Sequence, residues 1–111
     1  MIRLYTEKID NNVIISIDGD IEFDDSIRID NVIQNNFVNG SKNIILNLKN
    51  CEYIDNFGLG SLVKSLQLTK QNKRKFMLCN LSQDCKEIIM MTMLYKQIQI
   101  FNNVEDCISS V

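Results

Sequence analysis

Histidine is absent from the 111-residue sequence. Imidazole is the side chain that most often acts as a general base at neutral pH, so only carboxylates and lysines remain for that role. A hydrolase-type triad is effectively excluded. Because no nucleophile stands beside a base and no cluster of ligands suggests a metal, the sequence predicts a protein that is not an enzyme.

Proline is also absent, and the cysteines are few. Cys51, Cys79, Cys85 and Cys107 lack the C-x-x-C spacing of zinc sites, and no histidine is available to hold a metal with them. We expect reduced structural thiols and no cofactor. Without proline, repeats or low-complexity tracts there is no sign of a linker, and the length suits a single domain over residues 1–111.

An excess of charge of one sign is lacking too, because 12 basic residues face 14 acidic residues. The basic run Lys73-Arg74-Lys75 is too short to bind a nucleic-acid backbone and is typical of a solvated turn. The apolar stretches fall far below the ~20 residues that span a bilayer, and the first residues do not resemble a signal peptide. We expect a cytoplasmic protein with no nucleic-acid partner and no membrane contact.

The first part of the chain has the pattern of a β-hairpin followed by a helix. Residues 2–9 and 13–18 have strand character, and Asp10-Asn11-Asn12 tolerates the positive φ of a tight turn. The cluster Asp24-Asp25-Ser26 is suited to capping a helix that Gly40 closes. The apolar face of this predicted helix consists of Ile29, Val32, Ile33 and Phe37.

Further strands then alternate with helices. Strands are predicted at 43–48, 76–79 and 97–100, and helices from about Gly58 to Lys70 and from Asp84 to about Met91. The first of these helices has Ser, Lys and Gln on its polar face. A last helical stripe, with Asn102 or Asn103 as its cap, consists of Val104, Cys107, Ile108 and Val111. This order predicts an α/β fold with a mixed sheet packed with about four helices.

The most unusual segment is Cys51–Gly60, which leads from a strand into a helix with two glycines in its first turn. Glycine in a helix costs roughly 1 kcal/mol relative to alanine, so Gly58 and Gly60 indicate close backbone packing or access for a partner. Asp55 or Asn56 could cap this helix, which by itself would explain both residues. A phosphate-binding turn is weakly indicated, because the Walker spacing and a complete G-x-G-x-x-G are both missing.

Residues 54–62 resemble the D-S-S/T-G-L-G signature of STAS domains, the family of the anti-sigma factor antagonists. Residues 17–21 are similar to the family's G-E/D-L element, and residues 44–48 to the strand ahead of the signature. Residues 92–96 resemble its T-G-L-x-x segment, and residues 104–108 its final short helix. The resemblance covers essentially the whole chain and implies the STAS fold.

In that family the unphosphorylated antagonist binds a cytoplasmic anti-sigma factor, a GHKL-type serine kinase, until the kinase phosphorylates the signature hydroxyl. Carried over by position, the partner-binding residues are Asp55, Asn56, Phe57, Gly58, Leu59 and Gly60. The phosphoacceptor position is Phe57, and the serine before it is replaced by Asn56. Neither side chain has a hydroxyl, so phosphorylation at the family position is chemically impossible.

Phe57 has three interpretations: a buried core residue, an exposed aromatic anchor for a partner, or a residue that drifted after regulation was lost. Ser61 could be a displaced phosphoacceptor, although a kinase would reach it poorly within a helix. The methionines at 90, 91 and 93 could form an adaptable docking surface or belong to the core or its rim.

Two functions remain open. The first is a partner-binding regulator that is held in its binding-competent form because it lacks the phosphoacceptor. It would be either an antagonist that binds the anti-sigma factor or a scaffold that binds a related signalling protein within a larger signalling complex. The second is a module that binds a small ligand such as a nucleotide, or a subunit of a transport assembly, since some STAS domains are similar to transporter subunits.

Overall fold

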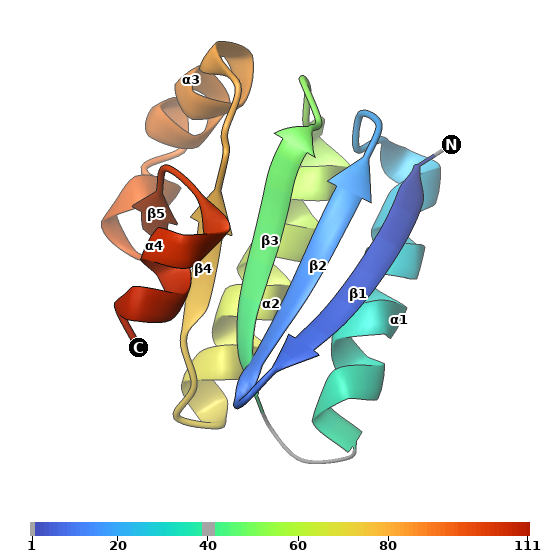
Figure 1. The fold of residues 1–111 in the computed structure, drawn as a ribbon. Coiled ribbons are helices and arrows are strands. Elements are labelled where there is room, and N and C mark those ends of the chain that lie inside the picture. Colours follow the sequence, from blue (N-terminus) through green and yellow to red (C-terminus); the bar gives the residue numbers. More distant parts are fainter. Residues whose placement is uncertain (1, 39–41) are drawn as a thin grey trace.

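A single five-stranded sheet organises the molecule, in the strand order β1-β2-β3-β4-β5. Figure 1 shows the computed structural model, which describes residues 2–38 and 42–111. The hairpin strands β1 (Arg3–Ile9) and β2 (Asn12–Asp18) are antiparallel. Parallel pairing then continues through β3, β4 and β5, which span Asn43–Asn50, Phe76–Cys79 and Gln99–Phe101. The carboxyl ends of β2 to β5 therefore share one edge of the sheet, the carboxyl edge.

Helices cover the two faces of the sheet unequally. Helices α1 (Phe23–Val38) and α2 (Asn56–Gln71) pack on one face, and the short α4 (Val104–Ser109) lies on the other, over β4 and β5 (Figure 1). Helix α3 (Gln83–Met91) follows β4, and a 3-10 turn at Leu94–Lys96 leads into β5. The predicted mixed sheet with four helices is confirmed.

The core is divided by the sheet. The larger part lies between the strands and helices α1, α2 and α3, and its fully buried members include Ile15, Leu46 and Leu78. A smaller cluster on the opposite face joins Met77 and Cys79 to Cys107 of α4. In the described part of the chain, no helix combines the length and the apolar character needed to cross a bilayer.

The start of α1 differs from the prediction. The helix begins at Phe23, so the acidic cluster lies inside its first turn and does not precede it. The Asp25 carboxylate accepts the backbone N–H of Glu22 at 3.1 Å and that of Ile2 at 3.3 Å. Asp25 therefore reaches back from the third helical position, as in a capping box. Gly40 and the side chain of Phe37 lie outside what the structure describes.

Two predictions near the C-terminus need correction. Strand β5 begins two residues later than predicted, because Met93 adopts a left-handed φ of 64° and the chain then makes the 3-10 turn. Val111 is exposed and does not extend the final apolar stripe, because α4 ends at Ser109. Asn103 caps α4, since its Oδ1 accepts the N–H of Asp106 at 2.8 Å.

Candidate partner-binding surface

The turn between β3 and α2 is fixed by backbone and capping hydrogen bonds. Asp55 caps the helix because its Oδ1 accepts the N–H of Gly58 at 2.9 Å. Its own N–H donates to the carbonyl of Ile21 at 3.1 Å, and the N–H of Ile21 donates to Tyr53 at 3.0 Å. Asp55 is thus the cap, while Asn56 is the first helical residue and α2 begins two residues before the predicted start.

Gly58 and Gly60 have opposite environments. A Cβ on Gly58 would lie 2.6 Å from Cγ2 of Ile54 and 2.7 Å from Cγ2 of Ile21, whereas a Cβ on Gly60 would have no neighbour within 4 Å. Gly58 therefore lets the first turn of α2 pack closely onto the core. Gly60 is exposed and leaves the backbone of the helix accessible.

Phe57, the second residue of α2, is 55% exposed. Its interpretation as a core residue is therefore wrong, and the anchor and the drifted residue remain. Asn56 beside it is also exposed, and Leu59 is half-buried. Of the partner-binding residues that the family resemblance implies, Asn56, Phe57 and Gly60 are therefore exposed, whereas Gly58 is packed against the core.

Ser61 is only 2% exposed and its hydroxyl donates to the carbonyl of Ser26 in α1 at 3.3 Å. Ser65 and Thr69 are buried along the same side of α2, where their hydroxyls donate to carbonyls of their own helix. The predicted polar face of α2 is therefore wrong for these residues, because small hydroxyl side chains allow α1 and α2 to approach each other. In this fold Ser61 is not accessible to a kinase.

Sequence reasoning missed Tyr53, which is 51% exposed beside the turn. Between the turn and α3 lies a shallow groove, which we call the turn–α3 groove and which is lined by Tyr53, Ile54, Asn56, Leu59, Ile88, Met91 and Thr92. Met91 is 83% exposed, and Met90 and Met93 are exposed as well, so these methionines are not core residues. A signal was present, because the buried positions of α3 are Cys85 and Ile89, with which Met90 and Met91 are out of phase.

The cysteines form two buried pairs that connect strand ends to helices. The Cys85 thiol donates to the carbonyl of Cys51 at 3.5 Å, and the thiols of Cys79 and Cys107 also interact. Burial raises the pKa of Cys79 to about 12. The hydrogen bond with Cys85, followed by burial, raises the pKa of Cys51, and the same bond lowers the pKa of Cys85 to about 7. All four side chains are fully buried, so they contribute to packing and are not open to a substrate.

The carboxyl edge is acidic. Exposed carboxylates in the segments that follow β2, β3 and β4 belong to Asp20, Glu22, Asp24, Glu52 and Asp84. The basic residues near these segments include Lys49, Arg3, which pairs with Asp18 across β1 and β2, and Arg28, which lines a hollow with Glu22 and Asp24, so carboxylates are in excess at this edge. Among the described residues, no three Asp, Glu or Cys side chains gather as a metal-ligand set.

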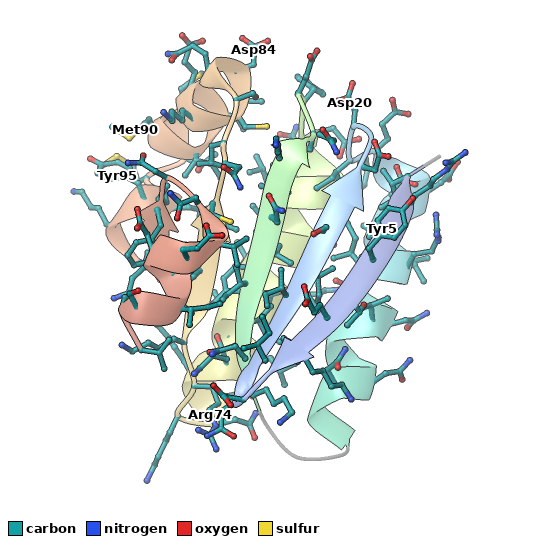
Figure 2. The ribbon with its side chains drawn as sticks, viewed as in Figure 1. Tyr5, Asp20, Arg74, Asp84, Met90 and Tyr95 are labelled. Atoms are coloured by element: carbon teal, nitrogen blue, oxygen red, sulfur yellow. The ribbon has the colours of Figure 1, made fainter. Side chains whose placement is uncertain are left out.

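The opposite end of the molecule is basic. Figure 2 shows Asp20 and Asp84 at the carboxyl edge and Arg74 at the far end. The basic residues near that far end are Lys8, Lys42, Lys70, Lys73, Arg74 and Lys75. The small net charge of −2 therefore conceals a separation of charge along the molecule.

The fold occurs in solved structures of low sequence identity. A protein from Thermotoga maritima that has been assigned as an anti-sigma factor antagonist superposes with a TM-score of 0.92 at 21% identity, over 97% of this chain and 93% of the other. An anti-sigma factor antagonist from Mycobacterium paratuberculosis gives 0.88 at 17% identity, over 100% and 94%. A sulfate transporter family protein from Wolinella succinogenes gives 0.78 at 15% identity, over 87% and 81%. At these identities the likeness establishes the fold alone.

The family itself is established by the sequence match. The STAS domain family matches residues 3–107, which include every strand and all four helices to within a few residues of the C-terminus. The signature turn, its capping aspartate and the buried Gly58 lie within the matched range. The chain therefore belongs to the STAS domain family.

Proposed function

We propose that this protein is a regulator of the anti-sigma factor antagonist type, which binds an anti-sigma factor of the GHKL kinase class in the cytoplasm and acts by docking, not by catalysis. The observation that carries the proposal is the exposure of Phe57 on the first turn of α2, at the family's phosphoacceptor position. An exposed aromatic residue on a rigid helix start is a favourable anchor for a protein partner, because it buries a large apolar area at little cost in side-chain entropy.

The proposal includes a fixed binding state. Phosphorylation would bring roughly 1.5 to 2 negative charges onto a docking surface and so end the association. Phe57 and Asn56 have no hydroxyl, and the Ser61 hydroxyl is buried against α1. We infer that binding is not switched at this turn and that any regulation acts through the partner or through the amount of protein.

A nucleotide-binding role has less support. Ligands of parallel sheets usually bind at the carboxyl edge, but here that edge carries Asp20, Glu22 and Glu52, which repel a polyphosphate. The structural likeness to a transporter-family protein concerns the fold alone. A thermal-shift titration with ATP and GTP tests this alternative, since a bound nucleotide would raise the melting temperature.

The test is a titration of the protein against GHKL-type anti-sigma factors from the same cell by isothermal calorimetry. We expect binding by the parent protein and a dissociation constant at least about fivefold weaker for Phe57→Ala, because truncation of an interface anchor typically costs more than 1 kcal/mol. Tyr5→Ala is a matched control, because Tyr5 is an aromatic residue of similar exposure on β1.

Phosphorylation is tested on the same complex. Incubation with the kinase and ATP should leave the intact mass of the protein unchanged. Stoichiometric phosphate uptake would overturn the fixed binding state, and equal affinities of the parent and Phe57→Ala proteins would overturn the assignment of the anchor.

A further inference from the structure

The turn–α3 groove lies beside the proposed anchor and is held open by the fold. Ser82 caps α3, and its hydroxyl donates to the carbonyl of Glu52 in the turn at 3.2 Å. The Cys85 thiol of α3 donates to the carbonyl of Cys51, at the start of the same turn. The Asp20 carboxylate accepts the N–H groups of Glu52 and Tyr53 at 3.0 and 3.2 Å. Both walls of the groove are therefore anchored to one another and need not be ordered by a partner.

The lining of the groove is apolar and adaptable. Tyr53 and Met91 stand exposed at its rim, and half-buried Leu59 and Ile88 form its base. Tyrosine is enriched in protein interfaces, and methionine conforms to irregular partner surfaces because its thioether chain is flexible. The side chain of Met91, at the end of α3, is 83% exposed and therefore contributes little to the core of the fold.

The surroundings of the groove are negatively charged. Glu52 is in the turn itself, Asp84 is in the first turn of α3 and Glu87 lies one turn further along, all of them exposed. Lys86 is the nearest basic residue on that helix. A charged rim around an apolar centre is the usual arrangement of a protein interface, and complementary charge on the partner accelerates association.

We propose that the turn–α3 groove is the second half of the partner-binding surface and that its occupant is a protein element with an apolar side chain flanked by Lys or Arg. This inference rests on the proposed function, which it extends from Phe57 to α3. The same negative rim disfavours anionic occupants such as a nucleotide, a nucleic acid or an acidic membrane. The occupant inserts its apolar side chain between Tyr53 and Met91 and places its basic residues against Glu52 and Asp84.

Alanine variants test the apolar half of this proposal. Tyr53→Ala and Met91→Ala should each weaken binding of the GHKL-type anti-sigma factor by roughly fivefold, the effect of an interface residue worth about 1 kcal/mol. Tyr5→Ala, 54% exposed on β1, should leave the affinity unchanged. Melting temperatures of all variants show whether the fold is kept.

Charge variants test the rim. Glu52→Lys should slow association and weaken binding severalfold, while Glu7→Lys, a charge reversal at an exposed residue of β1, should not. A rise from 50 mM to 500 mM salt should reduce the association rate of the parent protein more than that of Glu52→Lys, because salt screens exposed charges.

A defined probe makes the inference independent of any one partner. A Lys/Leu amphipathic peptide and its Glu/Leu counterpart are titrated into ¹⁵N-labelled protein, and the shifts of backbone amides are followed by NMR. We expect the basic peptide alone to shift the amides of Tyr53, Ile88, Met91 and Thr92, and Met91→Ala to reduce these shifts.

The outcomes separate this inference from the proposed function. If the anti-sigma factor binds and only Phe57→Ala weakens it, the proposed function holds and the groove proposal is wrong. If the anti-sigma factor does not bind but the basic peptide occupies the groove, the proposed function is wrong, while the assignment of the groove to a basic, apolar protein element holds for another partner. Shifts spread over the whole acidic edge, or equal binding of both peptides, overturn the groove proposal.

Discussion

Gly58 and Gly60 are two residues apart in one helical turn, yet only Gly58 is required by packing. The first turn of α2 lies directly on Ile21 and Ile54, which are themselves joined by an isolated bridge between the segments before α1 and α2. A side chain at Gly58 would force this contact apart. At Gly60 the space around a Cβ would be open, so packing within the chain does not require glycine there. Glycine at this position only weakens the helix.

We therefore expect Gly58→Ala to lower the free energy of unfolding by roughly 1–3 kcal/mol, because the added methyl group overpacks the core. Gly60→Ala is the control, because it makes the same substitution in the same turn. It should raise the free energy of unfolding by about 0.5–1 kcal/mol, because alanine favours the helix. Urea denaturation of both variants measures the difference. Equal effects of the two changes would contradict the assignment of Gly58 to packing.

At the level of the elements, the start of α1 is tied to the N-terminal residues. The buried Asp25 carboxylate accepts N–H groups from Ile2 and Glu22, and Nη1 of Arg28 donates to the carbonyl of Ile2 at 2.6 Å. This contact joins the beginning of β1 to the first two turns of α1. Helix α1 in turn packs against α2 through the buried Ser61 and Ser65.

Asp25→Ala should lower the free energy of unfolding by roughly 1–3 kcal/mol, because the buried N–H of Ile2 and the part-buried N–H of Glu22 lose their acceptor. Asp24→Ala, an exposed change in the same turn, should cost about 0.5 kcal/mol or less, from the helix dipole alone. Urea denaturation compares the two proteins. A similar loss in both would show that Asp25 acts through the dipole and not through its hydrogen bonds.

For the whole molecule, burial of the Cys79 thiol makes the free energy of unfolding fall at alkaline pH. The pKa of Cys79 is raised from 9.0 to about 12 by burial. Above pH 9 the thiol of the unfolded chain releases its proton while the folded protein retains it. The unfolded state then binds fewer protons than the folded state. The contribution of this thiol to the free energy of unfolding is therefore complete below pH 9 and is lost as the pH rises from 9 towards 12.

Between pH 8 and pH 10 this effect of Cys79 should lower the free energy of unfolding by about 1 kcal/mol. Cys79→Ala removes the titrating group, so its stability, although lower at pH 8 from the lost packing, should fall by that much less over the same interval. Urea midpoints at the two pH values, under a reducing agent, measure the two slopes. Identical slopes would mean that another group causes the alkaline loss.

Local sequence determined much of the fold, because strand alternation, helical periodicity and capping act over a few residues. The hairpin with a positive φ at Asp10 was predictable for this reason. Each of the two helix caps was predictable to within a pair of neighbouring residues, from which the structure selects Asp55 and Asn103. The lack of a hydroxyl at Phe57 likewise follows from the sequence by itself. These features need no knowledge of what lies across the molecule.

Tertiary structure decided which side chains are buried and which are left for a partner. Ser61 is buried although it is polar, because α1 approaches α2 there, and Phe57 is exposed although it is aromatic, because Gly58 takes the inward position. The turn–α3 groove needs the residues at 51–56 and 82–92 side by side, which only the parallel pairing of β3 with β4 provides. Burial depends on contacts between segments distant in sequence, and local patterns do not contain them.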